Sequence, residues 1–167
     1  MKEIVEKLKQ LPDSTVTVKR ENRIFVDVTK DKLISTLYST KLMGFNQLSI
    51  MSAIDRISDN EFELFYVLYS YKEKVNCIVR TRIPRDNPVI ETADKIYPPA
   101  HAYERELTEM FGIKVEGNAD SGKPFILENW NDKPPLRKDF DSLTYVNEHY
   151  EFRHSVDVDV NTEEKDE

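Results

Sequence analysis

The sequence of 167 residues is poor in several residue types, and each scarcity excludes a class of protein. A single cysteine, Cys77, cannot form a disulfide within the chain and fits a reducing cytoplasm. No uncharged run approaches the ~20 apolar residues that a membrane-spanning helix needs, so we expect no direct membrane span. Basic residues are outnumbered, because 24 Lys and Arg against 31 Asp and Glu give a net charge of −7. This balance disfavours a nucleic-acid-binding surface.

Residues that hold cofactors are also scarce. One cysteine and three scattered histidines, His101, His149 and His154, do not provide a cysteine-based metal or iron–sulfur site. The four glycines are too isolated to form a phosphate-binding loop. We therefore expect no catalytic residue, no cofactor and no metal site in this chain. An independent enzyme that uses Glu104 or Glu106 as a general base is disfavoured, because neither acid has a nucleophile or electrophile near it in sequence.

The N-terminal part of the chain shows helical and strand periodicities in turn. The first segment places its apolar residues on one helical face, and Pro12 ends it. Segments 15–20 and 23–28 alternate with period two around a short turn, which predicts a β-hairpin. Thr29 is a suitable N-cap for a following helix that Gly44 closes at the C′ position.

Three further strands are predicted, and the short turns between them favour an antiparallel meander over 47–57, 61–71 and 74–83. Four acids close to one of these turns are interpreted as solvated turn residues: Asp55, Asp59, Glu61 and Glu63. Both faces of the middle strand are largely apolar, so it should be central and covered on both sides. The helix before the meander covers one face, and a partner subunit is one candidate for the other. The predicted fold class is α/β, in an α+β two-layer form with a mainly antiparallel sheet covered by helices.

The C-terminal part differs in composition, since five of the eight prolines and three of the four glycines lie within residues 97–140. One helix is predicted at 99–111, with Pro99 in its first turn and Gly112 at its C′ end. The remainder has too few periodic apolar positions for its own core and is predicted to be an extended, proline-rich arm. The predicted organisation is a core domain at 1–115, a partner-binding arm at 116–154 and an acidic, disordered tail at 155–167.

The predicted helix at 99–111 carries an acid on its apolar face. At 100° per residue, Glu104 falls within the arc of the buried side chains. A buried carboxylate has to be paired, because an unpaired buried charge costs much free energy. One interpretation is an ordinary amphipathic helix with a solvated charged face, and the other is that Glu104 binds a basic group of the arm. Arg105 and Glu109 are spaced to form an ion pair on this helix.

The arm contains such basic groups. Residues 130–140 place Leu136 and Phe140 around three consecutive charged residues. Pro134 and Pro135 stiffen the chain into polyproline II, which lowers the entropy lost when the arm docks. Trp, Arg and Phe, all present here, are residue types that anchor interfaces. From the pattern alone, a charged surface loop is the other interpretation.

Two motifs resemble the C-subunit family of respiratory complex I, the family of the NADH-quinone oxidoreductase C-subunit. Residues 97–113, Tyr-Pro-Pro-Ala-His-Ala-Tyr-Glu-Arg-Glu-Leu-Thr-Glu-Met-Phe-Gly-Ile, are similar to the signature helix of that family. Residues 135–140, Pro-Leu-Arg-Lys-Asp-Phe, are similar to its second motif, and the order and spacing agree. The resemblance covers the chain from residue 1 to about residue 145. It marks these residues as family signature and candidate partner interface: Tyr103, Glu104, Arg105, Glu106, Glu109, Phe111, Gly112, Trp130, Pro135, Leu136, Arg137, Lys138, Asp139 and Phe140.

The resemblance implies a non-catalytic protein that carries no iron–sulfur cluster, flavin or metal. Such a subunit packs beside the relative of the large subunit of nickel–iron hydrogenases and near iron–sulfur subunits. Together they form the peripheral arm of a membrane-bound, ion-translocating oxidoreductase at the cytoplasmic face of the membrane. Iron–sulfur clusters, and in some relatives a nickel–iron site, are then expected in the partner subunits.

The sequence departs from the complex I pattern in two places. Where the family usually has His-Pro-Asp-Leu-Arg-Arg, residues 118–123 are Asn-Ala-Asp-Ser-Gly-Lys, without the arginine pair. After Phe140 the chain continues with Asp-Ser-Leu-Thr-Tyr in place of Pro-Leu and a glycine. These departures favour an archaeal or anaerobic relative, such as a membrane-bound hydrogenase or sulfur reductase, over complex I proper. The alternative from another class is a free-standing cytoplasmic adaptor that binds a protein partner through the proline-rich arm.

Overall fold

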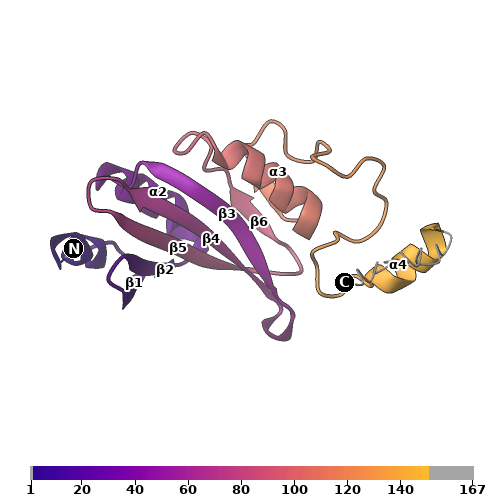
Figure 1. The fold of residues 1–167 in the computed structure, drawn as a ribbon, viewed down its shortest axis with the longest axis horizontal. Helices are drawn as coiled ribbons and strands as arrows, with labels where there is room; N and C mark the ends of the chain where they lie inside the picture. Colours follow the sequence, from indigo (N-terminus) through magenta and orange to yellow (C-terminus); the bar gives the residue numbers. More distant parts are fainter. Residues whose placement is uncertain (1, 151–167) are drawn as a thin grey trace, which may run out of the picture.

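The structure is a computed structural model that describes residues 2–150, and its centre is a five-stranded sheet (Figure 1). The strands are β1 (Ser14–Arg20), β2 (Arg23–Val28), β3 (Gln47–Arg56), β4 (Glu61–Ser70) and β5 (Val75–Pro84). They lie in the order β1-β2-β5-β4-β3. Only β2 and β5 are parallel, and the other neighbours are antiparallel. The predicted hairpin, meander and mainly antiparallel sheet are therefore confirmed.

The helices begin and end close to the predicted positions. They are α1 (Lys2–Lys9), α2 (Leu33–Leu42) and α3 (Ala100–Phe111). Helix α2 starts later than predicted, because Thr29 precedes a short 3-10 turn, η1 (Lys30–Lys32), and its side chain makes no capping bond. Gly44 does close α2, with a φ of 99° and its N–H donating to the carbonyl oxygen of Lys41.

All three helices bury their apolar residues in one core against one face of the sheet. On β4, this face carries four side chains with no exposed surface: Phe62, Leu64, Tyr66 and Leu68. The Phe62 ring meets the edge of Phe111 from α3, with 6.0 Å between ring centroids. The central position of β4 and the helical cover of one face are therefore as predicted.

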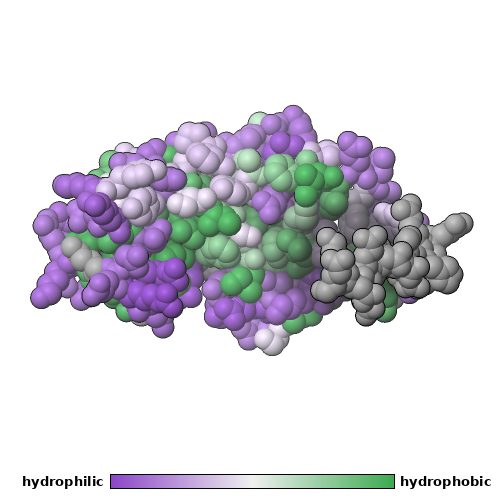
Figure 2. All heavy atoms as spheres, in the orientation of Figure 1, coloured by the Kyte–Doolittle hydropathy of each residue, from purple (hydrophilic) through white to green (hydrophobic). Residues whose placement is uncertain are grey.

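The second face of the sheet is less covered. Ile50 and Ile54 on β3 keep 44% and 39% of their surface exposed, and Phe65 and Val67 on β4 are half-buried. Figure 2 shows apolar residues gathered over the middle of the molecule, where β3 and β4 run. This face of β4 is therefore only partly covered over residues 2–150, and a partner subunit stays a candidate for the rest of its cover.

Three elements of the C-terminal part were not predicted. A parallel pair, β6 (Val89–Glu91) and β7 (Lys114–Glu116), lies next to α3. Residues 117–141 contain no helix or strand, which agrees with an extended arm, but α4 (Ser142–His149) then follows. Asp141 starts α4 by accepting the N–H groups of Leu143 and Thr144. The predicted acidic tail lies outside the described residues, and within them no helix is long and apolar enough to span a membrane.

Candidate functional site

Helix α3 and its C-cap carry half of the signature residues, and the helix has the ends that the sequence predicted. It follows Pro98 and Pro99 and ends at Gly112, whose φ of 72° is left-handed. The Gly112 N–H donates to the carbonyl oxygens of Leu107 and Thr108, which satisfies the last turn. Three sequence signals therefore predict the same helix, α3: helical periodicity, proline at the start and glycine after the end.

Glu104 is fully buried in α3, but its partners are not the predicted basic groups. Its Oε1 accepts the backbone N–H of Ala93 at 2.7 Å. Its Oε2 accepts the Thr92 hydroxyl at 2.7 Å and the Asn118 side-chain amide at 2.8 Å. Three neutral donors thus compensate the desolvation of the carboxylate. Glu104 therefore joins α3 to the segments that follow β6 and β7.

Arg105 and Glu109 also have partners other than those predicted, because each binds the arm. The Arg105 Nη2 donates to the carbonyl oxygen of Pro124 at 2.6 Å. The Glu109 carboxylate accepts the backbone N–H groups of residues 125–127 at 2.7, 2.9 and 3.1 Å. Burial would raise the pKa of Glu109, but these three donors and the nearby Arg105 lower it below its ordinary value. Helix α3 therefore holds the first part of the arm through its charged face.

The proline pair of the arm crosses the end of α3. The Leu136 N–H donates to the carbonyl oxygen of Met110 at 3.0 Å. The positive φ of Gly112 favours glycine at this turn, and a Cβ there would lie only 3.1 Å from the Cγ of Pro134, so a larger residue would also crowd the arm. Pro135 is half-buried beside it. The two sequence motifs of the chain are therefore in direct contact.

A buried ion pair holds the charged part of the second motif. The Asp55 carboxylate, 1% exposed, accepts Nε of Arg85 at 2.9 Å and Nη2 at 3.2 Å. It also accepts the backbone N–H of Lys138 at 2.9 Å, and Arg85 makes a further ion pair with Asp139. Burial would raise the pKa of Asp139, but the bond with Arg85 lowers it below its ordinary value. Asp55, interpreted from sequence as a solvated turn acid, is instead the buried anchor of the arm.

Arg137 points towards the chain's own sheet. Its guanidinium lies over the Phe62 ring, 5.2 Å from the centroid, and donates to the carbonyl oxygen of Arg85 at 3.3 Å. Lys138 differs, because only its backbone N–H has a described partner and the residue is exposed. Of the three charged residues of this motif, Lys138 is the one whose side chain is open to a partner.

Trp130 and Phe140 pack inside the arm. Their ring centroids are 5.5 Å apart, and Tyr145 of α4 contacts both rings, at 4.6 Å from Trp130. The Trp130 indole N–H donates to the carbonyl oxygen of Lys133 at 2.9 Å. The two aromatic residues predicted as partner anchors therefore organise the arm around α4.

Several exposed side chains of the arm are large and apolar. We call the following five exposed side chains the arm surface: Ile126, Leu136, Leu143, Val146 and Tyr150. Their exposure ranges from 48% for Val146 to 70% for Leu143. Three of them follow one side of α4 and its C-cap with i, i+3, i+7 spacing. Exposed apolar side chains gathered in one segment mark an interaction surface.

Two remaining signature residues have simple environments. The Tyr103 hydroxyl donates to the carbonyl oxygen of Ser49 at 3.0 Å, which ties α3 to β3. Glu106 is half-buried, and no hydrogen bond or ion pair of the residues 2–150 involves its side chain. Neither residue shows the arrangement of a catalytic acid or base.

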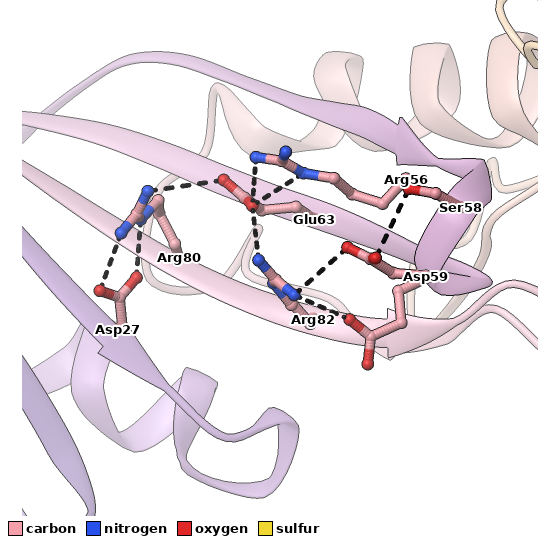
Figure 3. A network of polar contacts seen from close by, with 8 residues as sticks. Asp27, Arg56, Ser58, Asp59, Glu63, Arg80 and Arg82 are labelled. Atoms are coloured by element: carbon pink, nitrogen blue, oxygen red, sulfur yellow. Dashed lines mark hydrogen bonds and ion pairs between the residues drawn. The ribbon is translucent and has the colours of Figure 1, made fainter.

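A second polar cluster lies on the less covered face of the sheet, away from the signature. Arg56, Arg80 and Arg82 converge on Glu63, whose side chain is 6% exposed (Figure 3). Their nitrogens lie 2.8, 3.6 and 3.6 Å from its oxygens. Arg80 also makes two hydrogen bonds to Asp27, at 2.6 and 2.8 Å. Glu63 was interpreted from sequence as a solvated turn acid, and this was wrong.

Groups that would hold a metal do not come together in the described part of the chain. No three His, Cys, Asp or Glu side chains of residues 2–150 are arranged to hold a metal ion. Cys77 is buried, and burial raises the pKa of its thiol to about 12. A structural thiol is the interpretation that this environment favours.

Comparison with known proteins shows which class of protein shares this architecture. The chain is similar over 95% of its length to a protein in the structure of the membrane-bound sulfane sulfur reductase, an archaeal respiratory membrane complex. That match has a TM-score of 0.83, is 33% identical and covers 96% of the other chain. A fragment of Nqo5 (TM-score 0.61, 22% identical) shares the fold. The class is that of homologues of subunits from complex I-like membrane complexes.

The sequence defines the family more closely. Residues 26–146 match the family described as "Respiratory-chain NADH dehydrogenase, 30 Kd subunit", and the chain belongs to it. It is 33% identical to the C-subunit of F(420)H(2) dehydrogenase from Methanosarcina mazei, over 72% of this chain and 76% of that protein. It is also 33% identical to the C/D-subunit of NADH-quinone oxidoreductase from Hydrogenobaculum sp., over 78% of this chain but only 24% of that protein. The resemblance seen in the two motifs is thereby confirmed.

Replacing Glu104 by alanine should destabilise the chain strongly. Three buried donors would lose their acceptor, so we expect a loss of about 3–5 kcal/mol in the free energy of unfolding. Glu106→Ala on the same helix removes a side chain without a described partner and should change stability by less than about 0.5 kcal/mol. Urea unfolding followed by circular dichroism measures both. Equal effects of the two variants would contradict the role assigned to Glu104.

Two glycine variants separate backbone strain from contact with the arm. Gly112 and Gly122 both have positive φ, but only a Cβ at Gly112 meets another residue, Pro134. Both alanine variants should lose about 1 kcal/mol from backbone strain, and Gly112→Ala should lose more. Trp130 is the single tryptophan, so its fluorescence reports the arm. We expect an emission shift for Gly112→Ala only, and the same shift for Gly122→Ala would contradict the contact.

Proposed function

We propose that this chain is a non-catalytic structural and assembly subunit in the peripheral hydrophilic arm of a membrane-bound, ion-translocating oxidoreductase related to complex I. The partners proposed are a hydrogenase-large-subunit-like protein and neighbouring iron–sulfur subunits, at the cytoplasmic face of the membrane. The observation that carries the proposal is the arm, which is fixed in place by the signature residues and exposes an apolar surface.

The arm is bound to the core through polar groups and leaves five large apolar side chains exposed. Glu109 holds residues 125–127, Met110 holds Leu136, and Asp55 with Arg85 holds the segment that follows. A loop that only closes the surface of a free protein would present polar side chains to water. The arm does expose charged residues, but five large apolar side chains exposed in one segment support a partner that covers the arm surface.

The relatives support a membrane oxidoreductase as the source of that partner. The match to the protein of the sulfane sulfur reductase complex extends over nearly all of both chains. Other relatives are named as subunits of NADH-quinone oxidoreductase and F(420)H(2) dehydrogenase. Both departures from the complex I pattern, at 118–123 and after Phe140, favour a sulfur reductase or hydrogenase type. Iron–sulfur clusters, with a nickel–iron site in the hydrogenase type, are proposed for the partner subunits.

The charged residues of the signature support a structural role more than a catalytic one. Glu104 has no exposed surface, and its oxygens are occupied by neutral donors. Glu109 is occupied in the same way by backbone N–H groups. A general base needs access to a substrate proton, which neither arrangement favours. An independent enzyme based on Glu104 is therefore disfavoured.

A charged side chain on the arm surface should weaken assembly. Leu143 on α4 is 70% exposed, so Leu143→Glu should leave the isolated chain folded. We expect it to reduce co-purification with the hydrogenase-large-subunit-like protein by about tenfold or more, as for a residue central to an interface. Leu42→Glu is the matched control, because Leu42 on α2 is 72% exposed. Quantitative mass spectrometry of complexes from native membranes measures both.

The outcomes of this experiment separate the hypotheses. Wild-type chain that comigrates with no oxidoreductase subunits would favour the free-standing adaptor and contradict the proposal. If the Leu143→Glu and Leu42→Glu variants both comigrate with the oxidoreductase subunits as well as the wild type does, membership of the complex stands. The role of the arm surface in assembly is then contradicted.

Arg137 and Lys138, adjacent in sequence, should behave differently. Arg137→Ala removes an internal contact with Phe62 and should change Trp130 fluorescence in the isolated chain. Lys138→Ala keeps the backbone bond to Asp55 and should leave the isolated chain unchanged. In the complex, Lys138→Ala should lower affinity by a few fold, as expected for a charge at an interface rim. An unchanged fluorescence in Arg137→Ala would contradict the inward placement of Arg137.

A further inference from the structure

The less covered face of the sheet carries a row of apolar side chains across four strands. Phe25 on β2 lies opposite Ile78 on β5, and Ile78 lies opposite Val67 on β4. Val67 in turn lies opposite Ile50 on β3. Directly opposite residues share one face of a sheet, so these four side chains stand side by side. We call them the apolar row.

The apolar row borders a hollow. A cavity of about 450 Å³ lies on this face of the sheet, and five apolar side chains line it: Phe25, Ile54, Phe65, Val67 and Ile78. Ile50 and Ile54 are the most exposed apolar residues of β3, with 44% and 39% of their surface exposed. Apolar side chains that gather at an open hollow mark a binding surface.

The acids of this face are already paired within the chain. Arg56, Arg80 and Arg82 surround Glu63, and Arg80 also holds Asp27 (Figure 3). Arg56 and Arg80 line the cavity, but their charge is largely compensated by these acids. This charged cluster therefore closes one side of the hollow and leaves no free acid there.

Two arginines on the other side of the apolar row lack such compensation. Arg23 lines the cavity, is exposed and lies opposite Arg20 in the pairing of β1 with β2. Within residues 2–150, neither side chain takes part in a hydrogen bond, an ion pair or a ring contact, and Glu21 in the turn between them is no exception. Like charges directly opposite each other on a sheet repel. A carboxylate from another molecule would relieve this repulsion.

We propose that an amphipathic helix of a neighbouring subunit packs on the apolar row and that an Asp or Glu of this helix binds Arg20 and Arg23. The inference rests on the proposed function, because the helix comes from another subunit of the same complex. Strands spaced by about 4.8 Å place the ends of the row about 14 Å apart. About three helical turns have this length.

A helix suits the middle of a sheet face better than an extended segment. Around Val67 and Ile78, strands β4 and β5 have hydrogen-bonded neighbours on both sides. An extended segment on the row would find no strand edge, and its own backbone groups would face apolar side chains. A helix pairs its backbone groups internally and offers side chains only. Helices already cover the core face of the same sheet in this way.

Two other occupants fit these observations less well. A second copy of the chain, docked through the same face, would bring two more arginines and no free acid. A nucleobase would need an open aromatic ring on which to stack. The guanidinium of Arg80 already lies over the Phe25 ring, 4.7 Å from its centroid. Apolar side chains with one acid are the chemistry that both the row and the arginine pair accept.

Cysteine labelling in the assembled complex tests whether the row is covered. Ile50→Cys should react readily with maleimide in the isolated chain, while the native Cys77 is fully buried. In the assembled complex we expect at least about tenfold slower labelling, because an interface core excludes solvent. The matched control is Val18→Cys, since Val18 is 47% exposed and shares the opposite face with Ile24. It should keep its rate, and denaturing the complex should restore labelling of both variants.

Charge reversal tests the chemistry of the helix. Arg23→Glu should leave the isolated chain folded, because it sets an acid opposite Arg20. In the complex it should reduce the assembled fraction by about threefold or more, since it meets the acid of the helix. Lys95→Glu is the matched control, because Lys95 is exposed, has no described partner and lies outside the sheet.

Cross-linking identifies the occupant. A photo-crosslinker attached at Ile50→Cys should join a helical segment of another subunit that contains Asp or Glu. Reversing that acid to Lys should rescue the assembly of Arg23→Glu. Cross-links to a second copy, or to residues 151–167 of the same chain, would overturn the proposed helix.

The remaining contrary results separate this inference from the proposed function. Full labelling of Ile50→Cys in an intact complex would overturn the docking of the helix and leave the proposed function standing. Protection of the isolated chain by single-stranded oligouridine would assign a nucleic-acid surface and overturn the helix. A wild-type chain that joins no membrane complex would overturn the proposed function and this inference with it.

Discussion

The buried ion pair between Asp55 and Arg85 is the interaction on which the position of the arm depends. Asp55 lies at the end of β3 with a 1% exposed carboxylate, so it has to retain its donors. Two of them come from Arg85, and the third is the backbone N–H of Lys138 in the arm. Because Arg85 also binds Asp139, one buried pair fixes two consecutive residues of the second motif. Loss of Arg85 would leave the buried carboxylate of Asp55 without its ion pair, at a cost of about 3–5 kcal/mol.

On helix α3, carboxylates also gather several hydrogen-bond donors, but here the donors are neutral groups. Glu104 gathers three donors from two loops, and Glu109 gathers three consecutive backbone N–H groups of the arm. Backbone donors in a tight loop have few other acceptors, so a carboxylate satisfies them without any basic partner. The acids of the signature thus fix the conformation of segments before and after α3. This explains how a motif rich in charge can belong to a protein proposed to have no chemistry of its own.

The sequence was sufficient to predict elements governed by local periodicity, and insufficient for contacts between distant segments. Alternation predicted the strands, and Pro99 with Gly112 predicted the limits of α3. Helical periodicity also predicted the burial of Glu104, but its donors lie 11 to 14 residues away and belong to loops. Asp55 shares a strand face with buried Met51 and Ala53, so period two would have predicted its burial. Helix α4 is short, and its aliphatic residues Leu143 and Val146 are exposed.

The polar contacts that fix the arm also determine how its apolar surface would be presented to a partner. A flexible arm would lose conformational entropy when it docks, and that loss would oppose assembly. Here the arm is fixed before any partner arrives, through Glu109, the contact of Gly112 with Pro134, and the pair of Asp55 and Arg85. The arm surface is therefore presented in one geometry, and the free energy of its burial is available for binding. In the proposed complex, the charged residues of the signature would therefore reduce the entropic cost of assembly by fixing the arm in advance.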